Sequence, residues 1–479
     1  MAKNAVLHRL GTHSGPDDIE PSCGVIDIRE GTEIKQRLVI DCGSGSRRHK
    51  GVETFFGPDL SLFEDGRPID AVLVTHAHHD HVGCLPALVP YLSLDAQFIM
   101  TRPTALAVNQ AFMLELRAAS KAIAKTAPGV AKPYGLDDVR KMLSRVTEIT
   151  SAGCHELLPG LQVWVQSAGH ISGACSYTLL AGQTRVHYAG DRCDHDQPGI
   201  LGARPLPPAW RPQIVAGSDC TYGYDSGGTV PAWRSEMDRA IEMCRKALDE
   251  RRRVLFYAFS LHRAGAIAHE LQRAGLTRGG RVFLDGSACG FADLYTSDDH
   301  IWCDRDEKLV IDRVNHIWER KQREAVLNSN RGYVVIAPPG MGGPGGVGTW
   351  WRRELLPDPG AVVAFSGFVA PDTDGQIILA AEAERQRTGN DQRVKFRETD
   401  RLGHIQSVSL DLACQVEHFR LGGHNDRQGT IKWFLDLAPE TAILTHGSMN
   451  AIVSVEASLA GSGIKLIRSD LEPVTVIDL

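Results

Sequence analysis

The sequence predicts an α/β protein with more than one domain, and three observations support this. The chain has 479 residues, more than one hydrophobic core usually serves, so its length favours two or three domains. Short apolar runs bounded by glycine, proline and polar residues recur along the chain and predict buried strands. Stretches with helical spacing lie between many of these runs, and such alternation of strands and helices is typical of α/β folds.

The composition is that of an ordinary globular protein. Charged residues make up 23% of the chain, hydrophobic residues 43%, and the formal net charge is -6, so a nucleic-acid partner would need a local basic patch. The eleven cysteines include no Cys-X-X-Cys pair, which argues against a disulfide framework and favours a reducing cytoplasm. No apolar signal segment opens the chain and no eighteen apolar residues run together, so no membrane contact is expected.

The first hundred residues are predicted to form strands, with polar side chains where strands end. The apolar runs at 23–28 and 37–40 predict two strands, and Asp41 directly follows the second. The short apolar run at 71–74 predicts a strand that is covered on both faces of a sheet. A loop rich in potential metal ligands follows this third strand.

That loop carries four potential ligands within six residues, namely His76, His78, Asp80 and His81. Neutral imidazole suits Zn²⁺ and a carboxylate adds an anionic oxygen, so one loop can supply two ligands to each of two adjacent ions. We expect His76 and His78 to bind one ion, and Asp80 and His81 to bind the other. The alternative is a histidine-rich turn without metal, which the order His-X-His-X-Asp-His after a strand disfavours.

Helical spacing dominates residues 102–146, and strands return at 161–165 and 186–188. His170 lies between glycines after the first of these strands and is the expected third ligand of the first ion. Asp191 closes a Gly-Asp pair after the second, where its two oxygens can bridge both ions.

These stretches resemble the motifs of the metallo-β-lactamase superfamily, in which the acid at Asp41 braces the metal loop. The stretch from Asp219 to Gly223 resembles the acid-X-Thr-Tyr-Gly element of its β-CASP subfamily, and the resemblance is to the RNA-directed nucleases of that subfamily. It implies a metallo-β-lactamase fold, which is an αββα sandwich, with an inserted β-CASP α/β domain. We expect residues 1–223 and 399–479 to form the sandwich and 224–398 to form the insert.

Alternating strands and helices from residue 253 to 337 favour a parallel α/β unit in the insert. By composition alone, the Gly- and Pro-rich segment from Pro338 to Gly348 is a linker, whereas the resemblance implies an altered form of a Ser-Gly-Met loop at the cleft between the domains. Residues 385–401 are interpreted as a polar return crossing. Trp350 and Trp351 stand where the family usually carries paired histidines. They can stack on exposed bases or lie in the core, and both alternatives are open.

The resemblance also assigns two histidines near the end of the chain. His446 resembles motif C and is expected to bind the second ion. His424 resembles motif B, although Gly422 and Gly423 replace larger residues before it, and with Asp219 it is expected to act as general acid. The implied metal ligands are His76, His78, Asp80, His81, His170, Asp191 and His446, and the implied catalytic residues are Asp80, Asp191, Asp219 and His424.

The implied function is that of a ribonuclease with two Zn²⁺ ions per chain, which activate a shared hydroxide for attack on an RNA phosphodiester. Single-stranded RNA is the expected partner, because a histidine at motif C is associated with RNA-directed members. A DNA-processing nuclease and a catalytically silent scaffold are the alternatives, while the large insert disfavours a hydrolase of small lactones or β-lactams. Endonucleolytic or 5′-exonucleolytic action, and the formation of a homodimer, are left open.

Overall fold

The computed structural model of the protein describes residues 3–10, 21–49, 52–122, 132–224, 232–297, 308–343, 346–371, 373–399, 405–469 and 477–478. Part of the predicted helical region, 123–131, and the residues after the predicted domain boundary, 400–404, lie outside this set. No helix in the described ranges is long and apolar enough to cross a membrane.

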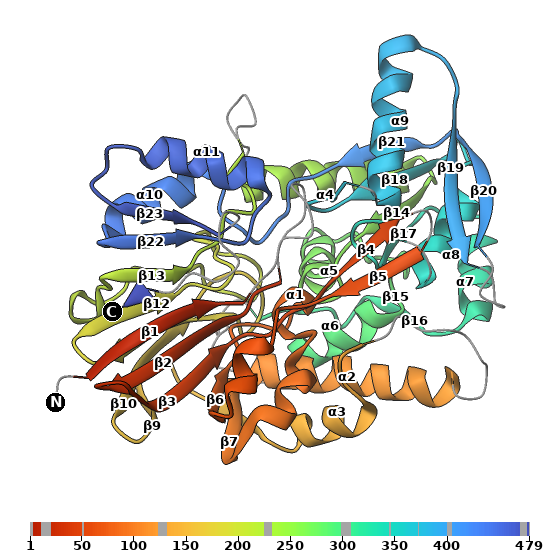
Figure 1. The fold of residues 1–479 in the computed structure, drawn as a ribbon. Coiled ribbons are helices and arrows are strands. Elements are labelled where there is room, and N and C mark those ends of the chain that lie inside the picture. Colours follow the sequence, from red (N-terminus) through yellow and green to blue (C-terminus); the bar gives the residue numbers. More distant parts are fainter. Residues whose placement is uncertain are drawn as a thin grey trace.

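Two sheets pack face to face and form the left half of the view in Figure 1. In the first sheet the strand order is β24 (Ile477–Asp478), β1 (Lys3–Arg9), β2 (Gly24–Glu30), β3 (Glu33–Ile40), β6 (Ile69–Leu73), β7 (Leu92–Thr101) and β8 (Val146–Ile149). In the second it is β23 (Lys465–Arg468), β22 (Thr441–Leu444), β13 (Ile214–Gly217), β12 (Thr184–Tyr188), β11 (Cys175–Ala181), β10 (Leu161–Ser167) and β9 (Gly153–Leu158). Alternate side chains of both sheets, such as Leu73 and Tyr177, share one buried core.

Helices cover the two outer faces of this sandwich. On the first sheet, α2 (Arg102–Ala122) and α3 (Leu136–Leu143) bury apolar side chains against Phe98 and its neighbours. On the second, α10 (Arg427–Leu437) and α11 (Met449–Leu459) pack through residues such as Phe434. The layer order is therefore αββα, as predicted. The remaining short elements are β4 (Gly45–His49), β5 (Val52–Phe56), η1 (Ser61–Asp65), α1 (His79–Val82), η2 (Leu85–Tyr91) and η3 (Pro208–Trp210).

The inserted domain has its own parallel sheet, on the right in Figure 1. The strand order is β16 (Asn315–Ile317), β15 (Val282–Asp285), β17 (Tyr333–Ala337), β14 (Arg253–Tyr257), β18 (Ala361–Phe365) and β21 (Gln415–His418). One face is covered by α4 (Trp233–Asp249), α5 (Arg263–Arg273) and α6 (Ser287–Ser297). The other face is covered by α8 (Gly346–Leu355) and α9 (Asp374–Thr388), and α7 (Arg320–Leu327) precedes β17. The predicted α/β insert is confirmed.

Two local predictions were wrong. The polar segment interpreted as a return crossing forms a long hairpin, β19 (Gln392–Thr399) with β20 (Ile405–Leu412), because its alternate residues Val394 and Phe396 are buried. The strand β21 of the inserted sheet then follows this hairpin. We therefore propose that the insert extends to about His418 rather than to residue 398.

The Gly- and Pro-rich segment is not a linker, because the helix α8 begins within it at Gly346. Tyr257 donates its hydroxyl to the carbonyl oxygen of Gly348 at 3.1 Å, which ties the segment to the sheet. Trp351 is 0% exposed and donates its indole N–H to Asp285 at 2.7 Å. Trp350 packs against the same core in part. Of the two alternatives for this pair, Trp351 takes the core position.

Candidate metal centre

The fold brings polar residues from the ends of several parallel strands to one edge of the sandwich. In the first sheet β3 and β6 are parallel neighbours, so Asp41 and the ligand loop after Leu73 meet at that edge. In the second sheet β12, β13 and β22 are parallel neighbours. Their ends are followed by Asp191, Asp219 and His446, respectively. Sequence positions far apart therefore converge because strands of like direction end together.

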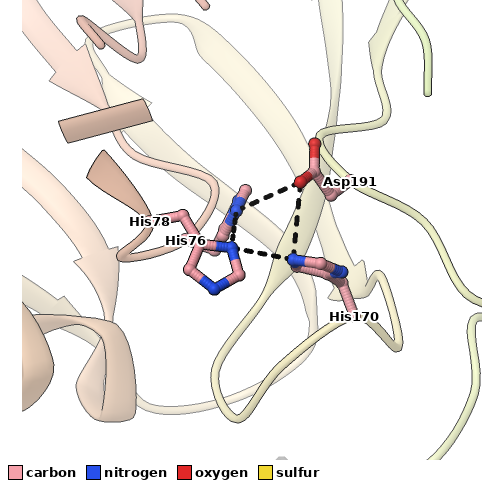
Figure 2. Close-up of side chains that lie close together, drawn as sticks. All are labelled: His76, His78, His170 and Asp191. Carbon is pink, nitrogen blue, oxygen red and sulfur yellow. Dashed lines mark hydrogen bonds and ion pairs between the residues drawn. The ribbon is translucent and has the colours of Figure 1, made fainter. Parts of the chain in front are cut away.

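A first group of side chains comprises His76, His78, His170 and Asp191, whose ligand atoms all lie within 4.8 Å of one another (Figure 2). The Nδ1 of His78 is 3.1 Å from the Nε2 of His76 and 2.9 Å from the Nε2 of His170. The Oδ2 of Asp191 is 3.4 Å from the Nε2 of His76 and 3.4 Å from the Nε2 of His170. Four ligand atoms thus point at one small volume.

A second group lies on the other side of Asp191 and comprises Asp80, His81 and His446. The Nε2 atoms of His81 and His446 are each 3.1 Å from the Oδ1 of Asp191. The Oδ2 of Asp80 is 3.8 Å from His446 Nε2. Asp191 therefore directs one carboxylate oxygen to each group, which is the arrangement of a bridging ligand.

The protonation of the first group suits a cation. Burial lowers the pKa of His78 to about 3, and it also lowers the pKa of His76 and of His170. These imidazoles are therefore neutral near pH 7, and the neutral imidazole is the form that binds metal ions.

In the second group, nearby carboxylates raise the pKa of both histidines. Burial lowers the pKa of His81, but the carboxylates of Asp191 and Asp41 outweigh burial and raise it well above its usual value. His446 likewise has a raised pKa, because Asp191 outweighs burial. His81 Nε2 and Asp191 Oδ1 make no hydrogen bond with good geometry among the described residues. A cation at this point would replace imidazole protons and satisfy both atoms, so the donor set fits a metal ion.

Asp41 braces the ligand loop from the neighbouring strand. It is buried, and its Oδ1 accepts a hydrogen bond from the Thr75 backbone N–H at 2.7 Å. Its Oδ2 accepts from Thr75 Oγ1 at 2.8 Å and from His81 Nδ1 at 2.8 Å. Because His81 donates from Nδ1, its Nε2 is left to face Asp191.

His424 lies beside both groups without belonging to either. Its Nδ1 donates to Asp219 Oδ2 at 2.8 Å, and its ring centroid is 4.4 Å from that of His170 and 6.2 Å from that of His446. Asp219 is fixed in turn by the backbone N–H of Arg192, at 2.9 Å. Burial lowers the pKa of His424, but the Asp219 carboxylate outweighs burial and raises it above the usual value.

The structure thus brings together every site residue that the sequence analysis named. The sequence analysis missed three polar residues that support the site, namely Thr75, Gln197 and Arg263. Thr75 directly precedes the named ligand His76, so the motif could have indicated it. Gln197 and Arg263 are joined to each other across 66 positions of the sequence, and no local pattern marks either residue.

The fold and the site together define a metallo-β-lactamase-fold protein with a His/Asp cluster able to hold metal. The family model described as "Metallo-beta-lactamase superfamily" matches residues 19–93. With its inserted domain and its relatives, the chain resembles the β-CASP branch of this superfamily.

The chain is similar in sequence to several curated proteins, three of which are described here. The chain is 27% identical over 433 residues to the transcription termination factor FttA of Methanocaldococcus jannaschii, covering 86% of this chain and 63% of FttA. It is 21% identical over 453 residues to an RNase J-like protein of the same organism, covering 91% and 92%, respectively. It is 21% identical over 450 residues to an Integrator complex subunit 11 homolog of Dictyostelium discoideum, covering 90% and 56%. The chain therefore spans less than two thirds of the length of that FttA.

A crystal structure of a protein of unknown function from Enterococcus faecalis matches over the full length of both chains, with a TM-score of 0.53 and 12% identity. At that identity the match supports the fold alone.

Proposed function

We propose that the chain is a ribonuclease that hydrolyses RNA phosphodiester bonds at a centre of two divalent metal ions. The observation that carries the proposal is the position of Asp191, which directs one oxygen to each of two ligand groups. The name of one relative, an RNase J-like protein matched over 91% of this chain, supports the same reaction class.

The ligand set favours zinc. His76, His78 and His170 would hold the first ion, and Asp80, His81 and His446 the second, with Asp191 between them. These are nitrogen and oxygen donors, which zinc accepts, and seven donors are too many for one tetrahedral ion. Two such ions would supply an activated water and neutralise charge on a phosphate.

His424 is the group we assign to the leaving oxygen. Since Nδ1 donates to Asp219, the opposite nitrogen, Nε2, is the atom that can release a proton. The raised pKa of His424 keeps the imidazole protonated near neutral pH, so it can act as general acid to the departing strand. Asp219 holds the ring in place and favours its charged form.

RNA is the favoured substrate because His446 lies at the position of motif C. The inserted domain also reaches the site, because the ring centroid of Phe259, before α5, is 6.4 Å from that of His78. Its α6 and the segment before α5 pack against the core of the first sheet. A cytoplasmic location is consistent with the cysteines, because all ten in the described ranges are free thiols.

The test measures bound zinc by atomic emission and follows end-labelled RNA and DNA of one sequence. We expect about two zinc ions per chain and a clear preference for RNA. Asp80→Asn removes the anionic ligand of the second group and should lose cleavage, whereas Asp436→Asn, on the exposed face of α10, serves as the matched control. Preferred cleavage of DNA would support the DNA-processing alternative, and no cleavage by zinc-loaded protein would support the scaffold. Full activity of Asp80→Asn would refute the two-metal assignment.

A further inference from the structure

A chain of hydrogen bonds joins the inserted domain to the backbone of a metal-group residue. Arg263, the first residue of α5, is 5% exposed, and its Nη1 donates to Gln197 Oε1 at 2.7 Å. Gln197 is 2% exposed, and its Nε2 donates to the carbonyl oxygens of Gly169 at 2.7 Å and His170 at 3.3 Å. The amide oxygen of Gln197 therefore accepts from the insert, and its amide N–H group donates to the loop of His170.

The same loop is held from a second side. His170 Nδ1 donates to the carbonyl oxygen of Gly423 at 2.7 Å, which leaves Nε2 to face the metal group. A Cβ atom at Gly423 would lie 2.5 Å from His170 O and 2.8 Å from Arg263 Nη2. Glycine is thus required there by the close approach of both residues, and this accounts for one of the two glycines that depart from the usual motif.

Arg263 is costly to bury in this way. It forms no ion pair with a carboxylate among the residues that the structure describes, and its Nη1 donates to a neutral amide. Burial lowers its pKa to about 10. Burying a guanidinium without a carboxylate is unfavourable relative to an apolar side chain of similar size. Packing of the two domains alone does not call for a charge at this position.

We propose that Arg263 is a positioning residue that acts through Gln197, so that the seating of the inserted domain on the sandwich sets the orientation of His170. The inference rests on the proposed role of His170 as a metal ligand. In this arrangement the first metal group reaches its binding geometry only when α5 is in place. The loss of a residue that orients a metal ligand typically lowers metal affinity by 10- to 100-fold.

Two substitutions separate this role from simple packing. Gln197→Glu keeps an acceptor for Arg263 but loses the N–H group that holds Gly169 and His170. Arg263→Met keeps the volume but removes the donor to Gln197. The control is Arg273→Met, on the same helix, where the side chain is 63% exposed and pairs with Glu270 at 3.6 Å.

Zinc affinity is measured without RNA, by competition with a chromophoric chelator, and the Tm of the metal-free proteins is recorded beside it. We expect Gln197→Glu and Arg263→Met to weaken the first zinc ion by about 10- to 100-fold, with the control unchanged and with kcat reduced more than KM is raised. A packing role alone would lower Tm and leave affinity unchanged. Should Arg263→Met fail to fold, Arg263→Lys is measured instead, with a smaller loss in the same direction.

Wild-type zinc affinity in both variants would overturn the proposal. A loss in Gln197→Glu with none in the Arg263 variant would also overturn it, because the insert would then not be coupled to His170. Failure of the wild-type protein to bind zinc would instead refute the proposed function, so the two failures can be told apart.

Discussion

Replacing Asp41 with asparagine tests whether the second metal group depends on its brace. The two residues have the same shape, and Asp41 has a φ of 58°, a left-handed conformation that asparagine also tolerates. The backbone therefore has no reason to move. The change is confined to the hydrogen bonds of one buried side chain.

The hydrogen bonds of Asp41 determine how much zinc affinity the substitution should cost. The carboxylate accepts from the Thr75 N–H at 2.7 Å, the Thr75 hydroxyl at 2.8 Å and His81 Nδ1 at 2.8 Å. An asparagine that keeps its oxygen on the Thr75 N–H turns its NH₂ group toward Nδ1 of His81. That nitrogen must then accept, which places the imidazole proton on Nε2, the atom that faces the metal group. Losing a hydrogen bond to a charged group costs about 1.5 to 3 kcal/mol, or roughly 10- to 100-fold in affinity.

The assay is a two-step zinc titration of the metal-free protein by calorimetry. We expect the second ion to bind about 10- to 100-fold more weakly in Asp41→Asn and the first ion to change little. The matched control is Asp65→Asn, which alters a carboxylate that pairs with Arg37 and contacts neither metal group. Wild-type affinity for both ions in Asp41→Asn would refute the bracing argument.

Three further predictions follow from single contacts. His424→Ala should keep both zinc ions while kcat falls by about 10² to 10⁴. Asp219→Asn should reduce kcat less, and it should move the alkaline limb of the pH-rate profile to lower pH, because it weakens the charge that raises the pKa of His424. Burial raises the pKa of Asp27, but hydrogen bonds from Arg37 outweigh burial and lower it to about 2, so its stabilisation is present above about pH 4 and is lost as pH falls through 2. Trp351→Ala should lower the free energy of unfolding by about 3 to 5 kcal/mol.

Each of these has a defined contrary result. Release of zinc by His424→Ala, measured by metal analysis, would make that residue a ligand rather than an acid. Urea unfolding between pH 5 and pH 2 tests the second, and an acid dependence in Asp27→Asn as steep as in the wild type would contradict it. For the third, a folded Trp351→Ala protein with unchanged stability but weaker RNA binding would favour the base-stacking alternative.

The sequence was most informative where chemistry is local. His76 to His81 follow one strand directly, so a single stretch predicted both the strand and the cluster of side chains at its end. The hairpin β19–β20 was missed although Val394 and Phe396 alternate with polar residues, because only one side of the ribbon is buried and the polar residues of the other side dominate its composition. The start of α8 was hidden by glycine and proline, which propensity alone assigns to loops.

The contact between Gln197 and Arg263 was beyond prediction from the sequence for a different reason. Each residue lies in an unremarkable local context, and only the docking of the insert on the sandwich brings their side chains to 2.7 Å. Long-range hydrogen bonds of this kind are set by tertiary structure, so they become visible only with coordinates.

The order of the metal-group residues along the chain has a consequence for a protein emerging from the ribosome. All four members of the first group lie before the insert, whereas His446 of the second group follows it. A growing polypeptide therefore contains the residues of the first group early, but α5 comes only with the insert, and the strand β22 that carries His446 into the second sheet is made after the whole insert. On the proposed function, the centre of two ions can therefore be completed only once the ribosome has passed β22, so a half-made chain would be inactive.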